Sequence, residues 1–492
     1  MIAEWVANEF SSIDLGDKRL DRRLKRSVTA VSKVGESTPD NCLQGGELKG
    51  MYRLVGNAKV DCQQILQEHQ SSTIRRCGNE DLVYLLSDTT EADLTKPKIV
   101  VEGAGPIGAG TRRGFYFHPS YAINQRGTPL GMVDHVIWAR PYDSLELTAK
   151  EKRSRKSQAC FEEKETWRWL EIQQNNEQLA RSIPTTNFVM VADSEADISE
   201  LLSESGDFPE NFDIIIRGCH NHRLSNTQAN QQATTGQTPG NLKVNEALRA
   251  TAVRFEIPVD VPARPKPITP ADKKRKRRQQ RSAHTAILSV RTARLTLEGI
   301  SRRGSTSLKP STLNAVELYE ENPPVSDVPI HWVLFSTLPI NTEKQIKAVI
   351  DGYTKRWLVE LYFKTLKSGL KIEEMKYRTL KRYLAAFAIS CVVAWRIEYL
   401  KAAARNDPQA PCSKYFTEQE WVPIVIFLEK KQADLQNPPT ISEFVTLIAR
   451  LGGYINKKSQ GPPGSKTIWR GIKRSDAIMQ AFRIFNDVRC GV

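Results

Sequence analysis

One apolar stretch with an unusual line of charges constrains this chain most, the segment 353–370, YTKRWLVELYFKTLKSGL. It lacks Pro and has no Gly before Gly369, so its pattern predicts one continuous helix. At ~100° per residue, one stripe about 80° wide holds Tyr353, Arg356, Glu360, Lys364 and Lys367. The remaining surface of this helix is mainly apolar, which predicts that most of it is buried. The stripe therefore places a single carboxylate among three cations.

Two interpretations of this stripe remain open from the stretch alone. Opposite charges at helical spacing commonly form an exposed ladder of ion pairs. Alternatively, Glu360 binds a metal ion and the neighbouring cations bind phosphate, since carboxylates are ligands for hard cations. The rest of the chain has to decide between them.

The charge balance favours a polyanionic partner. The chain has 492 residues, of which 40% are hydrophobic, and a formal net charge of +15. Its pI is about 9.3. An excess of this size is typical of proteins that bind nucleic acid, although basic ribosome-associated or membrane-surface proteins share it.

Several classes of protein are disfavoured. We expect no membrane span, because we find no apolar run that approaches the ~20 residues required. The start, MIAEWVANEF, does not resemble a signal peptide. Eight cysteines without a CxxC pair argue against a zinc site and a disulfide scaffold, and fit a reducing cytoplasm.

The first 60 residues or so are predicted to be helical. The segment 16–34, GDKRLDRRLKRSVTAVSKV, places basic residues beside apolar ones at helical spacing. We expect Arg22, Arg23 and Arg26 to contact DNA phosphates, although a solvated charged face would have the same pattern. A second helical piece at 43–57 would complete a small DNA-binding module.

The middle of the chain predicts strands around 82–86, 114–123 and 131–138, a helix at 161–182, and strands around 188–192 and 214–216. Asp88 follows the first of these strands and Asp193 follows the fourth. If those strands are neighbours in one sheet, the two carboxylates meet at one edge. Each could also be an ordinary turn or cap residue.

A β-rich insertion is predicted at about 222–340. Within it, 225–241 is a polar loop, 263–281 is a basic hairpin tip, and strands flank both. Residues 378–410 and 416–455 are predicted to be mainly helical, with a loop at 456–468.

Three carboxylates from two strand ends and a helix suit two Mg²⁺ ions, because hard cations prefer oxygen ligands. Two such ions about 3.5–4 Å apart can activate an attacking oxygen and stabilise the leaving oxygen in phosphodiester chemistry. This chemistry requires Asp and Glu rather than His, and it explains flanking cations that hold a DNA backbone.

These residues bring the chain close to a known family. The spacing Tyr353-x2-Arg356-x3-Glu360-x6-Lys367 resembles the YREK signature of bacterial insertion-sequence DDE transposases, in particular the transposon-five type. Further similar segments in the same order are EWVANEF, LGDKR, MYRLVGN, DTT at 88–90, DSEAD at 193–197, IIIRG at 214–218, PIHWVLFS at 329–336 and ARLGG at 449–453.

The resemblance implies an α/β fold with an RNase H-like mixed sheet, interrupted by the β-rich insertion. It implies Asp88, Asp193 and Glu360 as the catalytic and metal-binding triad, with two Mg²⁺ ions per active site for which Mn²⁺ would substitute. It implies DNA contacts from Tyr353, Arg356, Lys364, Lys367 and Arg217, and a Trp332 that stacks on a flipped base. Trp332 could instead be an ordinary core residue of its strand.

Two positions depart from the family pattern. Ser194 stands where the family has Arg, and Cys219 stands where it has Lys. Both changes remove a phosphate contact, so we expect recognition of the DNA end to differ here.

We therefore predict a cut-and-paste transposase that binds terminal inverted repeats and target DNA, acts as a homodimer, and is cytoplasmic and nucleoid-associated, with no membrane partner. The predicted domains are 1–64 for DNA-end binding, 65–377 for catalysis and 378–492, helical, for dimerisation. Two rivals are a DNA-binding protein without catalysis and a structure-specific nuclease on the same fold. The presence of all three carboxylates weighs against the first rival.

Overall fold

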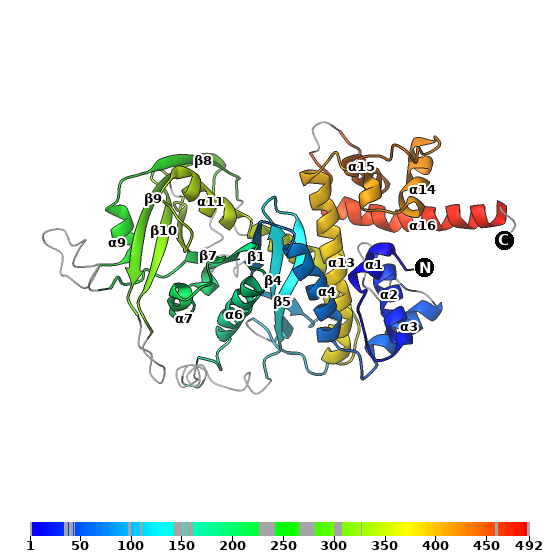
Figure 1. The fold of residues 1–492 in the computed structure, drawn as a ribbon, viewed down its shortest axis with the longest axis horizontal. Helices are drawn as coiled ribbons and strands as arrows, with labels where there is room; N and C mark the ends of the chain where they lie inside the picture. The colour runs from blue at the N-terminus through cyan, green and yellow to red at the C-terminus, as the bar shows by residue number, and fades with distance from the viewer. Residues whose placement is uncertain are drawn as a thin grey trace. The chain divides into compact units, whose positions relative to one another are not determined.

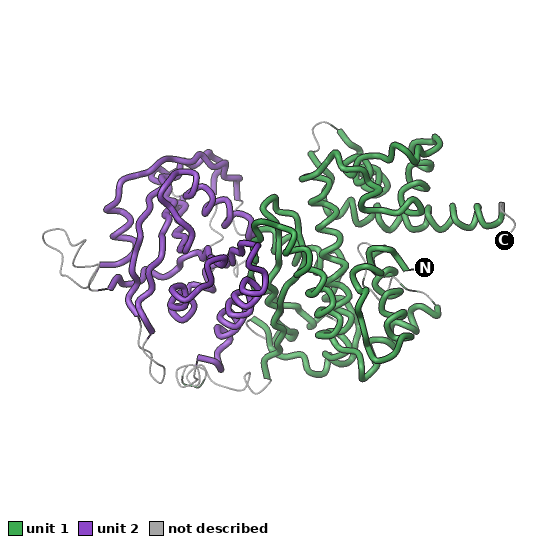
Figure 2. Tube along the Cα trace, viewed as in Figure 1, with its two compact units in different colours: residues 1–154, 357–492 green, residues 155–356 purple. Residues whose placement is uncertain are grey.

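The computed structural model describes residues 2–33, 38, 43, 45–96, 100–108, 111–141, 151, 154, 161–225, 242–264, 281–299, 308–325, 327–457 and 461–489. The predicted polar loop at 225–241 and basic tip at 263–281 lie almost wholly outside these residues. The chain divides into two compact units, residues 1–154 with 357–492 and residues 155–356 (Figure 2). Each unit is described separately below.

Unit 1 begins with helices and continues into a small antiparallel sheet. Its first helices are α1 (Glu4–Glu9), α2 (Lys18–Ser32), α3 (Gly45–Val55) and α4 (Cys62–Cys77). Its strands are β1 (Leu82–Ser87), β2 (Thr90–Asp93), β3 (Gly105–Pro106), β4 (Arg113–Asn124) and β5 (Pro129–Trp138). Strand β4 pairs antiparallel with each of the other four. The turn between β4 and β5 uses Gly127 at φ 78°, which an L side chain rarely adopts.

The rest of unit 1 is helical. It contains α12 (Trp357–Lys364), a π-helical turn (Thr365–Gly369), α13 (Leu380–Asn406), α14 (Glu418–Glu429), α15 (Ile441–Leu451) and α16 (Ser465–Arg489). Most residues of helix α13 are buried, because α2, α4, α15 and β5 pack against it (Figure 1). The sequence predicted helical structure where α13, α14 and α15 lie, but it did not delimit α16.

The apolar length of α13 corrects one sequence expectation. By length and composition this helix could cross a membrane, whereas we expected no such run. However, 83% of its apolar window is buried inside the protein, as in the core helix of a soluble domain. Its Trp395 indole also donates to the Pro129 carbonyl of β5 at 3.2 Å, which fixes the helix to the sheet.

Unit 2 contains a mixed sheet. Its elements are α6 (Trp167–Ser182), β6 (Asn187–Ala192), a 3-10 turn (Ser194–Ala196), α7 (Ser199–Ser203), β7 (Phe212–Gly218), α9 (Val244–Arg249), β8 (Phe255–Val261), β9 (His284–Leu297), β10 (Ser311–Glu320), β11 (His331–Ser336) and α11 (Glu343–Thr354). Strands β6 and β7 are parallel, and β7, β11, β10, β9 and β8 follow in antiparallel order. The predicted β-rich insertion is therefore confirmed, and its last strand pairs directly with β7.

The predicted continuous helix at 353–370 is wrong. Helix α11 ends at Thr354, whose hydroxyl donates to the Asp351 carbonyl at 2.8 Å, and α12 begins at Trp357. The Arg356 amide donates to the Tyr353 carbonyl, three residues back, at 3.0 Å. Such i−3 bonds tighten a helix and end it. A π-helical turn follows α12, so the five charged and aromatic positions do not share one helical stripe.

The predicted domain limits remain predictions. The boundary at residue 64 falls in the first turn of α4, whereas the boundary at 377 falls just before α13. The two compact units divide the chain differently, since unit 1 contains both its beginning and its end.

Candidate active site

Asp88 is held at the end of a buried strand. Five of the six residues of β1 are buried, and Asp88 follows them with 8% of its surface exposed. Its Oδ1 accepts a hydrogen bond from the Thr89 amide at 2.8 Å. The Thr89 hydroxyl is 2.8 Å from Nδ1 of His118 on β4. These contacts fix the orientation of the carboxylate at the strand end.

Glu360 lies half-buried on α12, and this helix is fixed by aromatic packing. The Tyr362 ring stacks on Tyr121 of β4 with centroids 4.5 Å apart, and its hydroxyl donates to the Cys391 carbonyl of α13 at 3.2 Å. Helix α12 also contacts β1. Asp88 and Glu360 are therefore carried by packed neighbouring elements of one unit.

The two basic residues after Glu360 lie in different kinds of helix, one α-helical and one π-helical. Lys364 ends α12 and is exposed. Lys367 lies in the π-helical turn, half-buried, with Nζ 4.0 Å from the Glu373 carboxylate. The Thr365 hydroxyl anchors this turn by donating to Glu398 at 2.5 Å. A π-helical turn places Lys367 away from its α-helical position, and such turns are frequent at functional sites.

Asp193 belongs to unit 2, where it follows the buried strand β6. Its side chain accepts a hydrogen bond from the Glu195 amide at 2.8 Å and caps the 3-10 turn. Asp193 is therefore a cap residue, which was one of the two interpretations of its position in the sequence. The predicted triad draws on both units, so its convergence stays a prediction.

Three predicted DNA-contact residues of unit 2 lie together. The guanidinium of Arg217 is 5.3 Å from the centre of the Trp332 indole, and the Tyr353 ring meets that indole edge-on with centroids 5.3 Å apart. Strand register explains the first contact, because Arg217 is opposite Leu334 and Trp332 is two residues away on the same face. Trp332 is only partly buried, whereas Tyr353 is 5% exposed.

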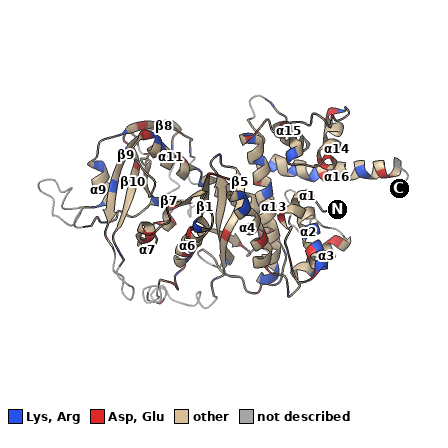
Figure 3. Ribbon diagram, in the orientation of Figure 1, with Lys and Arg blue, Asp and Glu red and all other residues tan. Residues whose placement is uncertain are grey.

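The three predicted phosphate-binding arginines of α2 have different environments. Arg22 and Arg26 are exposed, whereas Arg23 is half-buried and its guanidinium donates to Glu47 of α3 at 3.1 Å. Basic and acidic residues are interspersed along α2 and α3 (Figure 3). The bare pattern of the sequence could not separate a cation that binds a neighbouring helix from one that faces solvent.

One residue that positions the segments after β6 and β7 was not singled out from the sequence. Asp197 is fully buried, and its Oδ2 accepts hydrogen bonds from the amides of Cys219 and His220 at 2.7 and 2.8 Å. It thereby ties the segment after β6 to the end of β7. The available signal was the second Asp of the DSEAD segment, which starts with Asp193.

Comparison with protein families gives three matches along the chain. A transposase DNA-binding model matches residues 2–60, a transposase DDE domain matches 214–395, and a transposase Tn5 dimerisation domain matches 392–487. The DDE match contains Glu360 but starts after Asp88 and Asp193. All three matched models describe parts of transposases, and a DDE domain implies an RNase H-like fold.

Together the three matches support a Tn5-like DDE transposase. Among solved structures it is similar to the cryo-EM structure of a piggyBac transposase synaptic complex with hairpin DNA, with 8% identity and a TM-score of 0.33. That alignment covers 75% of this chain and 57% of the other. The family assignment rests on the three matched parts, which confirm the predicted class.

Proposed function

We propose that this chain excises a mobile DNA element by cut-and-paste transposition. It binds terminal inverted repeats through the helices before residue 64, and a second copy joins it through the helices after residue 378. It then cleaves the DNA ends and joins them to a target. The observation that carries the proposal is the location of Asp88 at the end of β1 with α12, which bears Glu360, packed against that strand.

The proposed catalytic groups are Asp88, Asp193 and Glu360. DDE transposase domains generally use divalent metal ions. The donor set here fits Mg²⁺, because each group offers carboxylate oxygens and the Thr89 amide already orients one of them. When bound, two such ions would activate the attacking oxygen and stabilise the leaving oxygen.

The remaining groups would position the DNA. Arg356, Lys364 and Lys367 follow or flank Glu360 and would hold phosphates next to the cleaved bond. Arg217 and Trp332 would hold an unstacked base near the same end, with Tyr353 against the ring. In this order of steps, water attacks first, the freed 3′-OH then attacks the opposite strand to close a hairpin, and the hairpin is reopened before joining.

Carboxylate-to-amide variants test the proposal. Asp88→Asn, Asp193→Asn and Glu360→Gln should each lower Mg²⁺-dependent cleavage by roughly 10⁴-fold, the scale for removing one member of a catalytic unit. Binding to inverted-repeat DNA in a gel-shift assay should persist. The matched control is Glu343→Gln, an exposed carboxylate at the start of α11. Cleavage by the Glu360 variant at the rate of the control would exclude this triad.

The same assay separates the two rivals. A DNA-binding protein without catalysis would bind the ends but leave them intact in Mg²⁺ and Mn²⁺. A structure-specific nuclease would cut DNA that lacks inverted repeats and would form no joined product. Cut-and-paste activity requires both end-dependent cleavage and joining to a target plasmid.

A further inference from the structure

The segments that follow β6 and β7 meet at one edge of the sheet in unit 2. These strands are parallel, with Val191 opposite Ile215 and Ala192 opposite Ile216, so their carboxyl ends lie side by side. Asp197 lies after β6, and Cys219 and His220 lie directly after β7. Their potential ligand atoms, a carboxylate oxygen, the thiol and a ring nitrogen, all lie within 4.8 Å of one another.

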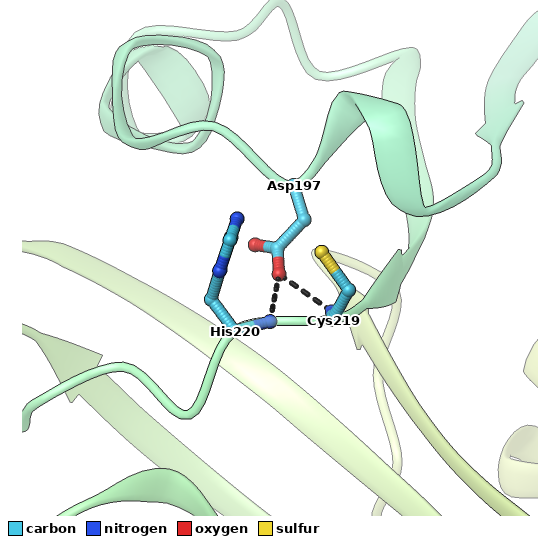
Figure 4. A group of neighbouring side chains, drawn as sticks. All are labelled: Asp197, Cys219 and His220. Carbon is cyan, nitrogen blue, oxygen red and sulfur yellow. Dashed lines mark hydrogen bonds between the residues drawn. The ribbon is translucent and has the colours of Figure 1, made fainter. Parts of the chain in front are cut away.

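The carboxylate of this group is held in place by the protein. Asp197 is fully buried, its Oδ2 accepts from two successive amides, and its Oδ1 is 2.6 Å from Nε2 of His222. A carboxylate has about four acceptor positions, and these contacts use three. Figure 4 shows the carboxylate between the His220 imidazole and the Cys219 thiol.

The other two members can be reached from solvent. Both Cys219 and His220 are exposed. The thiol donates a weak hydrogen bond to the Ser194 carbonyl at 3.3 Å, and it also interacts with the Asp197 carboxylate. Among the described residues, the His220 imidazole has a ring contact with His222 but no hydrogen-bond partner. These side chains can therefore rotate towards an ion without breaking strong contacts.

We propose that Asp197, Cys219 and His220 bind one Zn²⁺ ion, with the fourth position open to water. A thiolate and an imidazole favour zinc over Mg²⁺, which prefers oxygen ligands. Zinc bonds of 2.0–2.3 Å require the ligand atoms to approach to roughly 3.5 Å, a small rotation for two exposed side chains. His222 is a positioning residue, because it orients the Asp197 carboxylate.

The ion would connect two segments that also carry residues of the proposed active site. Asp193 comes four residues before Asp197, and Arg217 comes two residues before Cys219. Zinc would therefore stabilise the segment after β6 against the end of β7. This inference does not depend on the proposed transposition reaction, and its test requires no catalytic turnover.

The test measures metal content and spectroscopy of the full chain. After incubation with ZnCl₂ and desalting, we expect one zinc per chain by mass spectrometry, and a thiolate-to-metal absorption band when Co²⁺ replaces zinc. Cys219→Ser should remove the band, and Cys219→Ser and His220→Ala should each weaken zinc binding at least about 100-fold, whereas His222→Ala should weaken it by about 10–100-fold. The matched control is Cys62→Ser, a half-buried thiol on α4 in the other unit.

Thermal melting supplies an independent readout. Zinc should raise the melting temperature of the parent chain and of Cys62→Ser, but not that of Cys219→Ser, and all three should melt alike in chelator. Cys42, Cys160 and Cys490 lie outside the described residues, so the variants rather than the stoichiometry assign the site. Failure of the parent chain to bind zinc, or unchanged binding by Cys219→Ser, would overturn the proposal.

Discussion

The guanidinium of Arg217 lies over the indole of Trp332, with its Cζ 5.3 Å from the ring centre. The two residues come from neighbouring antiparallel strands, β7 and β11, and are 115 positions apart in the chain. The Tyr353 ring, on α11, meets the same Trp332 indole edge-on. This arrangement offers a flat ring with a cation beside it, which is a suitable platform for an unstacked base.

Truncation of Trp332 should therefore affect one step more than another. Stacking of one base contributes about 1–3 kcal/mol, so Trp332→Ala should slow hairpin formation by about 5–150-fold and the first nick much less. Trp332→Phe is the control that retains a flat ring. Both steps can be followed on labelled end DNA in denaturing gels. Equal losses in both would instead identify Trp332 as a structural strand residue.

The arginines of α2 should differ in their effect on DNA binding. Arg22→Ala and Arg26→Ala should each reduce the slope of log affinity against log salt by about 1, because each exposed cation would lose one phosphate contact. The comparison variant is Arg23→Ala, which loses the contact with Glu47 and should lower thermal stability instead. If all variants have the same salt slope as the parent chain, the prediction that α2 contacts DNA is wrong.

Glu9 should be important for the stability of unit 1. Its carboxylate is 2.5 Å from Nδ1 of His69 and accepts two hydrogen bonds from Arg76 at 2.8 and 3.1 Å. Because Glu9→Ala leaves these two groups without their partner, it should reduce the free energy of unfolding by about 3–5 kcal/mol. Glu4→Ala, exposed on the same helix, should change it by less than about 0.5 kcal/mol. Urea denaturation measures both.

The same carboxylate should contribute to acid unfolding. Burial raises the pKa of Glu9, but the hydrogen bonds and charges of His69 and Arg76 outweigh burial and lower it to about 2. Since the folded-state pKa is below the usual value of 4.5, the stabilisation is present above pH 4.5 and is lost as the pH falls towards 2. A Glu9→Gln chain should lose less stability than the parent over that interval.

Glu177 should give the opposite pH dependence in unit 2. Burial and the nearby Glu204 carboxylate raise its pKa from 4.5 to about 7. The folded state therefore holds more protons between these values, and stability should fall as the pH rises from 4.5 to 7. Glu177→Gln should raise the melting temperature at pH 8 by about 2–4 °C, the shift expected for 1 kcal/mol in a domain of this size.

A pH series distinguishes this effect from a general one. The gain from Glu177→Gln should disappear at pH 4.5, where the parent carboxyl is protonated as well. Glu210→Gln, an exposed carboxylate before β7, should show no such trend. A gain of equal size at both pH values would contradict the raised pKa of Glu177.

Much of the architecture could be predicted from local pattern. Apolar runs ending in Asp88 and Asp193 are strands in the structure, and the insertion around residues 222–340 is β-rich. Alternation and helical spacing predict such elements because burial imposes a period on the sequence. The break at residues 355 and 356 was not predictable in this way, because a hydroxyl bond and i−3 hydrogen bonds end α11 where no Gly or Pro marks it.

The sequence by itself determined the class of protein, through the order of its motifs and the residue types that metal-dependent phosphodiester chemistry needs. Only the tertiary structure decided which of those residues meet. Strand register brings Arg217 to Trp332, and Arg23 donates a hydrogen bond to Glu47 of α3. Parallel pairing of β6 with β7 brings Asp197, Cys219 and His220 together. Contacts of this kind join positions far apart in the chain, and no local periodicity encodes them.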